Sequence, residues 1–315
     1  MYGDLKIFSG SSHVGLAQAV VDHLGLPLGK LHVTCFSNEN LKVRIDENVR
    51  EADVFIIQTA CPPLSEHLME LLITIDAIKY ASAARITAVL PYFPYARSDK
   101  KDETRISITA RLMADLLQTA GAHRVLTMAL HSPQILGFFH IPADELLATS
   151  IFMRHFSSSG LEDPVVVATD AGAGTVAGSF ANRMGVPLAI VDKRRFDDSE
   201  SAVSHSLIGS VEGKDAIIYD DEIATGGSIL EAARIIMKFG ARTVRAGATH
   251  AVLSHPFQDR LPQADLAEIV LTDTIPIPEV KRTRLPGLHV LSVAGLFGDA
   301  IQRIHAGLSI SEMMK

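Results

Sequence analysis

The sequence contains few of the residues that build disulfide frameworks, zinc-thiolate sites or membrane spans. Only two of its 315 residues are cysteines, Cys35 and Cys61, and they form no CxxC pair. A disulfide framework or a zinc-thiolate site is therefore not expected, and this use of cysteine indicates a reducing compartment. No apolar run reaches about 18 residues, and residues 1–10 lack a long apolar core behind a basic start. The sequence thus predicts a cytoplasmic protein that contacts no membrane.

Basic residues are not in excess either. Lys and Arg number 29 against 36 Asp and Glu, which makes the formal net charge -7. Non-specific nucleic-acid binding usually requires a basic excess, so no nucleic-acid partner is expected, although a local basic site for a small phosphate ligand is compatible with this charge. Hydrophobic residues make up 47% of the chain and charged residues 21%, which indicates a folded chain. Its length allows two domains of ordinary size.

Short apolar runs alternate with amphipathic stretches along the chain. The apolar runs expected to form strands lie at residues 53–58, 85–90, 125–128, 165–169, 188–191, 216–219 and 244–249. The stretches expected to form helices lie at residues 67–81, 107–120 and 228–239. In the last stretch, Ile229, Ala233 and Ile236 share one face at helical spacing, and Gly240 supplies a helix stop. Alternation of this kind predicts parallel sheets covered by helices.

The chain also matches itself once. Residues 85–131 and 216–250 each contain a strand, a polar loop, a helix, a Gly-Ala pair, a strand and a histidine. The spacing from the Gly-Ala glycine to the histidine is the same in both, from Gly121 to His131 (131 − 121 = 10) and from Gly240 to His250 (250 − 240 = 10). This single match leaves duplication and coincidence equally open. A duplication would mean two similar α/β domains divided near residues 144–150.

One expected strand leads directly into two adjacent carboxylates. Asp220 and Asp221 follow the run 216–219, and a Thr-Gly-Gly-Ser turn then opens a helix. Carboxylates are costly to bury without partners, and this pair suits the two vicinal hydroxyls of a ribose, whereas the turn offers backbone N–H groups to an anion. The alternative is a solvated pair before an ordinary helix. The residues expected to bind ribose 5-phosphate are Asp220, Asp221, Thr225, Gly226, Gly227 and Ser228.

Several segments resemble one enzyme family. Residues 220–228 resemble the phosphoribosyl pyrophosphate loop of the type I phosphoribosyltransferase fold. Residues 91–102, which read Pro-Tyr-Phe-Pro-Tyr-Ala-Arg-Ser-Asp-Lys-Lys-Asp, resemble the ATP loop of ribose-phosphate pyrophosphokinases. Further segments similar to that family lie at residues 48–50, 69–75, 137–139, 211–214 and 272–276. Because the matches cover nearly the whole chain in order, the chain is identified as a member of the ribose-phosphate pyrophosphokinase family.

The resemblance implies an α/β fold of two pseudo-symmetric type I phosphoribosyltransferase-like domains, each a mostly parallel sheet flanked by helices. Residues 1–147 would form the domain with the ATP loop, and 148–292 the domain with the ribose 5-phosphate loop and the catalytic loop. Residues 293–306 would pack back onto the first domain. The implied reaction transfers the β,γ-diphosphoryl group of ATP to the C1 hydroxyl of ribose 5-phosphate, giving phosphoribosyl pyrophosphate and AMP. The family also implies a homo-oligomer, either a dimer or a hexamer.

The resemblance also assigns roles to individual residues. Lys193 and Arg195 match catalytic cations on a polar stretch through Ser206, and the composition of this stretch predicts a mobile loop. The resemblance implies that the loop closes over the transferring phosphates. His131 and Asp170 match positions near magnesium, so Mg2+ is the expected cofactor. The residues matched to ATP binding are Phe36, Asn38, Arg97, Ser98, Asp99, Lys100 and Asp102, the first two contributed by a neighbouring subunit. From the sequence alone, Phe36 fits a core aromatic equally well.

The chain departs from the family pattern at several positions. Ala129, Asn40 and Ser98 stand where Asp, Glu and Gln are usual, and Ala224 replaces an Asp of the ribose phosphate loop. Residues 176 and 178, a valine and a glycine, replace basic residues that bind phosphate or ADP as effectors in the regulated class. Neither kind of regulation is therefore implied for this chain.

Three other functions fit parts of the sequence. A non-catalytic regulatory homologue would keep the fold but lose the cationic loop, and a phosphoribosyltransferase would share the carboxylate loop without needing the ATP loop. An NAD-dependent oxidoreductase is suggested by residues 172–177, which fit G-x-G-x-x-A, with Asp192 placed 18 residues after Gly174 (192 − 174 = 18). Against it, Asp170 lies in the turn that a pyrophosphate would have to approach.

Overall fold

The computed structural model describes residues 3–195 and 203–314. The chain divides into two compact units. Unit 1 consists of Met1–Ala148, Thr274–Pro276 and Ser292–Lys315, and unit 2 consists of Thr149–Asp273 and Ile277–Leu291. In the part of the chain that the structure describes, no helix has both the length and the apolar character needed to cross a membrane.

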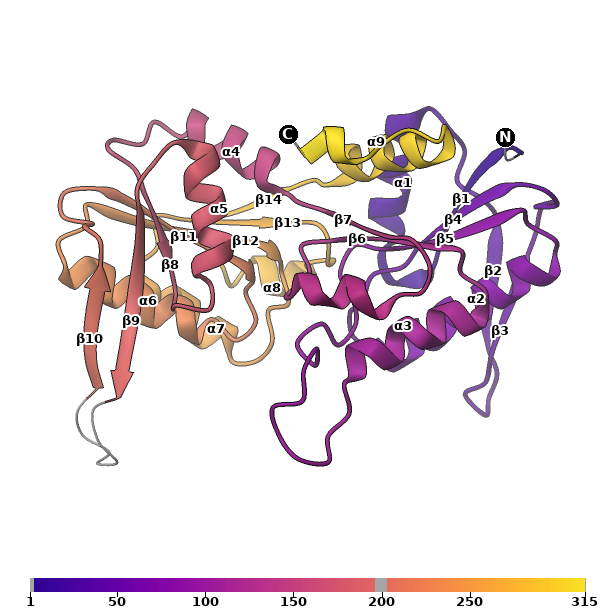
Figure 1. The fold of residues 1–315 in the computed structure, drawn as a ribbon, viewed down its shortest axis with the longest axis horizontal. Coiled ribbons are helices and arrows are strands. Elements are labelled where there is room, and N and C mark those ends of the chain that lie inside the picture. Colours follow the sequence, from indigo (N-terminus) through magenta and orange to yellow (C-terminus); the bar gives the residue numbers. More distant parts are fainter. Residues whose placement is uncertain (1–2, 196–202, 315) are drawn as a thin grey trace. The chain divides into compact units, whose positions relative to one another are not determined.

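Unit 1 contains a sheet of five parallel strands between two layers of helices (Figure 1). The strands, in sheet order, are β1 (Leu5–Ser9), β4 (Asp53–Ile57), β5 (Arg85–Leu90), β6 (Arg124–Met128) and β7 (Ala143–Leu146). Helices α1 (Val14–Leu24) and α9 (Ala294–His305) cover one face, and α2 (Leu64–Tyr80) and α3 (Thr109–Ala120) cover the other. The central strands β4 and β5 are buried along their whole length because helices cover both faces, which explains their continuous apolar runs.

The smaller elements of unit 1 lie around this sheet. An antiparallel hairpin of β2 (Leu31–Cys35) and β3 (Leu41–Ile45) extends from it (Figure 1). Short 3-10 helices form η1 (Ser11–His13), η2 (Pro133–Phe138) and η4 (Ser311–Met314).

Unit 2 is built around a seven-stranded sheet with the order β10-β9-β8-β11-β12-β13-β14. Its strands are β8 (Val165–Ala168), β9 (Leu188–Arg195), β10 (Val203–Ile208), β11 (Asp215–Glu222), β12 (Thr243–His250), β13 (Glu268–Thr272) and β14 (Leu288–Leu291). All neighbours are parallel except β10, which runs antiparallel to β9. Helices α4 (Thr149–Ser158) and α5 (Gly174–Met184) lie on one face, and α6 (Gly227–Lys238) and α7 (Phe257–Arg260) lie on the other (Figure 1). The remaining short elements are η3 (Leu261–Ala264) and α8 (Glu279–Arg282).

The two units repeat the same succession of elements. Strands β1, β4, β5, β6 and β7 are equivalent to β8, β11, β12, β13 and β14 in both chain order and sheet order. The β2–β3 hairpin is equivalent to β9–β10, and a bond from the Gly29 N–H to the Ile7 carbonyl (2.7 Å) joins the start of β2 to β1. The final helix α9 packs on α1 as α4 packs on α5, so the C-terminal helix completes unit 1. The fold is thus two pseudo-symmetric α/β units.

The two units do repeat the same fold, but the sequence match aligned strands that are not equivalent. Strand β11 is equivalent to β4, not to β5 as the match implied. The turn at Gly240 (φ +85°) is therefore equivalent to the turn at Ser82 (φ +68°), each three residues before the next strand (85 − 82 = 3; 243 − 240 = 3). His131 and His250 are not equivalent, because His131 is exposed beyond β6 whereas His250 is buried in β12. Strand–helix units of similar length recur throughout such folds, which makes a single match ambiguous by one unit.

Several strands continue beyond their apolar runs. Strand β11 extends to Glu222, and β9 extends to Arg195, which lies opposite Val203 of β10 in the antiparallel register. The prediction of a polar loop from residue 193 was therefore wrong for residues 193–195 and 203–206, which belong to β9 and β10. The end of a strand needs backbone partners but not apolar side chains, so it is not visible in an apolar pattern. Residues 196–202, the rest of the expected loop, lie outside the described residues.

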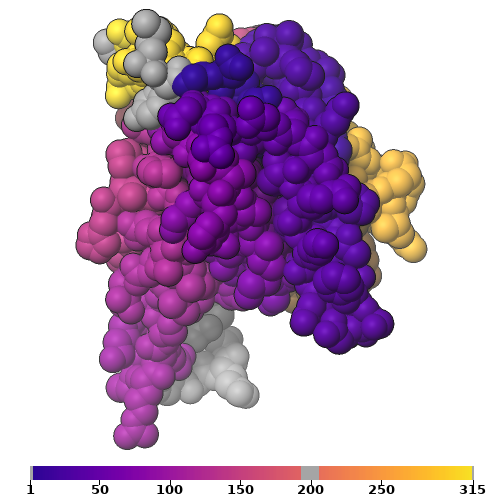
Figure 2. Space-filling view, turned by 90° about the vertical axis from the view of Figure 1, so that its right-hand side faces the viewer, coloured from indigo at the N-terminus to yellow at the C-terminus, as the bar shows by residue number. Residues whose placement is uncertain are grey.

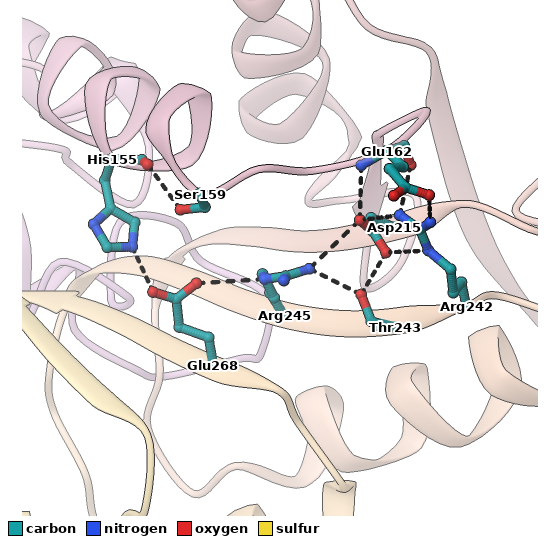
Figure 3. A network of polar contacts seen from close by, with 8 residues as sticks. All are labelled: His155, Ser159, Glu162, Asp215, Arg242, Thr243, Arg245 and Glu268. Atoms are coloured by element: carbon teal, nitrogen blue, oxygen red, sulfur yellow. Dashed lines mark hydrogen bonds and ion pairs between the residues drawn. The ribbon is translucent and has the colours of Figure 1, made fainter.

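Ion pairs to a buried aspartate hold the first residue of β4 in unit 1 and the first residue of β11 in unit 2. In unit 1 the side chain of Asp53 is fully buried, and Arg85 donates to both of its oxygens, from Nε at 2.7 Å and from Nη2 at 2.5 Å. In unit 2, Asp215 is 3% exposed and accepts from Arg242 Nε at 3.0 Å and Nη2 at 2.5 Å (Figure 3). Because β11 is equivalent to β4, the two aspartates lie at equivalent strand positions, whereas Arg85 is the first residue of β5 and Arg242 directly precedes β12.

Candidate functional site

The carboxylate pair of unit 2 lies within a strand. Asp220 pairs with Ala248 across β11 and β12, so the expectation that the strand ends before the pair was wrong. Asp221 is 8% exposed, which does not fit the alternative of a solvated carboxylate pair. Asp220 is half-buried and accepts hydrogen bonds from Thr169 Oγ1 (3.2 Å) and from the Asp221 backbone N–H (2.9 Å). These bonds orient the Asp220 carboxylate beside the carboxyl end of β8.

The environment of Asp220 favours its protonated form. Burial, reinforced by the neighbouring Asp221 side chain, raises the pKa of Asp220 to about 8, whereas the bond from Thr169 lowers this pKa. Asp220 therefore holds its proton near neutral pH. A ligand that brings hydroxyl donors or positive charge to the pair would favour release of that proton.

A glycine turn after the pair leads into α6. Gly226 has a φ of +74°, which favours glycine, and a Cβ at this position would lie 2.8 Å from Leu261 Cγ. Glycine has no side chain with which to cap a helix, and the first N–H groups of a helix have no partner inside it. The turn therefore leaves the N–H groups at the start of α6 available to an anion. The six predicted ribose 5-phosphate residues thus lie on one continuous strand–turn–helix segment of unit 2.

An arginine that the sequence did not identify contacts this turn. Arg260, the last residue of α7, donates from Nη1 to Thr225 Oγ1 at 2.9 Å. The same nitrogen lies 3.1 Å from the place that a Cβ on Gly227 would occupy. Arg260 and Thr225 are 35 residues apart in the chain, and no motif surrounds Arg260, so only the folded structure reveals the contact.

Five residues predicted to bind ATP share one long loop of unit 1, and these are Arg97, Ser98, Asp99, Lys100 and Asp102. This loop joins β5 to α3 and projects from the unit, as its purple segment shows in Figures 1 and 2. The Ser98 N–H donates to the Tyr95 carbonyl (2.9 Å), and the Ala110 N–H donates to the Ser98 carbonyl (3.2 Å). Arg97, Lys100 and Asp102 are exposed, whereas Ser98 and Asp99 are half-buried.

Phe36 and Asn38 lie in the turn of the β2–β3 hairpin. The turn is closed by a bond from the Phe36 N–H to the Asn40 carbonyl (2.9 Å), and Asn38 Oδ1 accepts from the Asn40 N–H (3.3 Å). Phe36 is 48% exposed, so its alternative interpretation as a core aromatic was wrong. An exposed ring in a hairpin turn can stack on a base.

The remaining predicted residues fall in different places. The backbones of Lys193 and Arg195 lie in β9, and their side chains are outside the described part of the chain. His131 is exposed in unit 1, whereas Asp170 lies in unit 2 and accepts the Ala173 N–H at 3.0 Å. His131 and Asp170 thus belong to different units. Among the residues described, no three His, Cys, Asp or Glu side chains are grouped to hold a metal ion.

The dinucleotide alternative does not fit the turn before α5. The Asp170 carboxylate oxygen Oδ1 lies 3.1 Å from the place that a Cβ on Gly172 would occupy, so a pyrophosphate approaching this turn would meet a negative charge. Asp192, which the alternative assigns to a ribose, instead lies inside β9 and accepts from Ser206 Oγ at 3.3 Å. The fingerprint in the sequence is therefore not supported by the local chemistry.

Comparison with known proteins gives a consistent set of relatives. The profile of the N-terminal domain of ribose phosphate pyrophosphokinase matches residues 5–121, and that of the phosphoribosyl synthetase-associated domain matches residues 200–315. A ribose-phosphate pyrophosphokinase of Caldanaerobacter subterraneus is 49% identical over 310 residues, covering 98% of this chain and 97% of that protein. One from Deinococcus radiodurans is 48% identical over 312 residues, with the same two coverages. The crystal structure of phosphoribosylpyrophosphate synthetase from Mycobacterium smegmatis has a TM-score of 0.91 and 42% identity, and the match covers 97% of this chain and 100% of that one.

Proposed function

This chain belongs to the ribose-phosphate pyrophosphokinase family, and we propose how its residues divide the family's reaction between the two units. The chain is a transferase that moves the β,γ-diphosphoryl group of ATP to the C1 hydroxyl of ribose 5-phosphate, in nucleotide biosynthesis. Both units have the phosphoribosyltransferase-like α/β fold that the sequence predicted. The observation that supports this assignment is the carboxylate pair of unit 2, which is followed by a helix N-terminus without a side-chain cap.

In this proposal unit 2 binds the sugar phosphate. Asp220 and Asp221 accept hydrogen bonds from the vicinal ribose hydroxyls, which are neutral donors. The turn at residues 225–228 binds the 5-phosphate with backbone N–H groups and hydroxyls, and the helix dipole of α6 adds positive potential. Ala224 in this loop carries no charge, so the carboxylates of the segment before the turn come from Asp220, Asp221 and Glu222.

In the same proposal unit 1 binds ATP. The exposed Arg97 and Lys100 supply positive charge to the triphosphate, and a guanidinium can bind a phosphate through two parallel bonds. We propose that Ser98, Asp99 and Asp102 of the same loop also bind ATP. Phe36 and Asn38 bind the adenine of a neighbouring subunit, which requires a homo-oligomer, and the 48% exposure of Phe36 supports that role.

The reaction itself depends on positioning and charge. The C1 oxygen attacks the β-phosphorus, the bond from that phosphorus to the oxygen bridging the α- and β-phosphates breaks, AMP leaves with that oxygen, and the C1 hydroxyl proton is released. Phosphoryl-type transfer needs neutralisation of the crowded oxygens more than covalent help from the protein. We assign this to Lys193 and Arg195, whose charges are most valuable where negative charge builds up in the transition state.

The oxygen donors near the sugar site fit Mg2+ as the cofactor. Asp170, Asp220 and Asp221 offer carboxylate oxygens, and His131 is proposed near the metal on the ATP side. A cation that keeps several waters and takes phosphate oxygens needs only one or two carboxylates, so a dense cluster of protein ligands is not required. When bound, Mg2+ would supply charge neutralisation on the phosphate oxygens.

We also infer that the protein acts in the cytoplasm, where ATP is abundant. The two cysteines support this location, because in the described part of the chain Cys35 and Cys61 are not joined in a disulfide.

A direct assay tests the proposed function. Purified protein is incubated with ATP, Mg2+ and ribose 5-phosphate, and AMP is followed, with ribose in place of ribose 5-phosphate as the control. We expect AMP only with the sugar phosphate. If no AMP forms while ATP and ribose 5-phosphate still bind, the protein is a regulatory homologue, and Ala129 and Ala224 become the first positions to change to Asp.

A further inference from the structure

We propose that Arg260 is a positioning residue for the 5-phosphate of the sugar, acting through Thr225. The inference rests on the proposed sugar site of unit 2 and extends it by one residue from a different part of the chain. Its basis is the contact between the end of α7 and the turn that opens α6. Three features of this contact point to an anion.

The first feature is that the segment carrying Arg260 is fixed. Phe257, Leu261 and Ala264 of α7 and η3 are buried and belong to the core of unit 2. Leu261 packs so close to the turn that a Cβ on Gly226 would lie 2.8 Å from its Cγ. Because the residue that follows Arg260 is locked in the core, the arginine is presented to the turn from a rigid base.

The second feature is the direction of the hydrogen bond. Arginine has donors only, so Thr225 Oγ1 must accept the 2.9 Å bond from Arg260 Nη1. The hydroxyl proton of Thr225 is then left to be donated elsewhere. A phosphate oxygen bound by the N–H groups at the start of α6 is an acceptor of the kind this proton needs. Arg260 thus makes Thr225 a directed donor for the phosphate.

The third feature is charge. Arg260 is half-buried, and among the described residues it forms no ion pair, in contrast with Arg85 and Arg242, which each bind a buried aspartate. A partly desolvated cation without a counter-charge costs free energy. A phosphate in the turn would supply the missing negative charge, and the cost would be offset on binding.

The role predicts a specific kinetic signature. The 5-phosphate does not react, so its contacts are the same in the ground state and in the transition state. Removing such a contact raises KM and leaves kcat unchanged. Arg260 should therefore contribute to the selection of a phosphorylated sugar and not to the rate of diphosphoryl transfer.

The test compares Arg260→Gln with wild type in the AMP assay. We expect KM for ribose 5-phosphate to rise by about 10- to 100-fold, the effect of losing a charge-assisted hydrogen bond, while kcat and KM for ATP change less than about threefold. Arg234→Gln is the matched control, because Arg234 is an exposed arginine of α6 that donates to Gln263 Oε1 at 3.4 Å, and it should behave as wild type. Arg260→Lys, which keeps a charged donor, should recover part of the lost affinity.

Two further measurements separate the possible outcomes. If Arg260 acts through Thr225, Thr225→Val combined with Arg260→Gln should raise KM little more than either change alone, and fully additive losses would overturn the role assigned to Thr225. Calorimetry with ribose 5-phosphate and with inorganic phosphate measures the same loss without turnover. An inactive wild type would refute the proposed function, whereas an active wild type with an unchanged Arg260→Gln KM, or with a loss only in kcat, would overturn this inference alone.

Discussion

Replacing Asp220 by Asn should stabilise the protein increasingly as the pH rises. Burial and the adjacent Asp221 raise the pKa of Asp220 from its ordinary 3.8 to about 8. Between these pH values the folded wild-type chain holds a proton on Asp220 that the unfolded chain has lost. The stabilisation of the wild-type fold by this proton is fully present below about pH 4 and disappears as the pH rises through 8. The greatest slope is about 1.4 kcal/mol per pH unit, or about 4 kcal/mol from pH 5 to pH 8. Because Asp220 is half-buried and water reaches it, we expect about 2 kcal/mol over that range.

The assay is urea unfolding of wild type and Asp220→Asn at pH 5, 6, 7 and 8. The free-energy difference between the two proteins should increase steadily with pH in favour of the variant, because the amide does not titrate. Asp259→Asn, a change in an exposed carboxyl of α7, is the control and should show no such trend. A difference that stays constant from pH 5 to pH 8 would refute the reasoning that the pair holds a proton.

The remaining predictions address the ion pairs and the proposed roles. Arg85→Ala leaves the fully buried Asp53 without its guanidinium and should lower the free energy of unfolding by about 3–5 kcal/mol in urea, whereas Arg44→Ala, at an exposed pair, should cause no measurable loss. Asp221→Ala should weaken ribose 5-phosphate binding in calorimetry while ATP affinity is retained, and an unchanged sugar affinity would count against the loop assignment. Lys193→Ala should reduce turnover sharply and leave sugar affinity nearly intact, because its charge acts mainly in the transition state; equal losses in both would contradict that role.

The sheets were predictable from the sequence wherever a strand is buried on both faces. The run at residues 85–90 coincides with β5 because every residue of that strand is buried. The ends of β9 and β11 were not predictable, since Arg195 and Glu222 are charged residues whose backbones pair in the sheet with Val203 and His250. Apolar patterns report burial of side chains, and the backbone ladder extends beyond them.

The candidate site was predictable only where its residues are contiguous. Residues 220–228 form one strand–turn–helix segment, and their spacing carries the chemistry. Arg260 contacts the same turn although it lies 35 residues from Thr225 in the chain. It does so because Leu261 and Ala264 of η3, which follow it, are buried. A contact of this kind depends on packing between separate elements, which no local pattern encodes.

The pseudo-symmetry explains why we place the sugar site in unit 2 and not at the equivalent place in unit 1. Counting from the equivalent Asp53 and Asp215, the positions of Asp220 and Asp221 are occupied in unit 1 by Gln58 and Thr59 (53 + 5 = 58; 215 + 5 = 220).

In unit 1 the side chains of Gln58 and Thr59 already form hydrogen bonds within the protein. Gln58 Oε1 accepts from Ser12 Oγ at 2.7 Å and from the Ser12 N–H at 3.1 Å, and Gln58 Nε2 donates to the His67 carbonyl at 2.9 Å. Thr59 Oγ1 donates to the Thr274 carbonyl at 2.6 Å. A Cβ on Gly10 would lie 2.1 Å from Gln58 Oε1, so the amide fills the space there. Neutral side chains already bonded to the protein have no charge and little hydrogen-bonding capacity left for a sugar, so the equivalent strand end in unit 1 stabilises the fold while that of unit 2 remains available for binding.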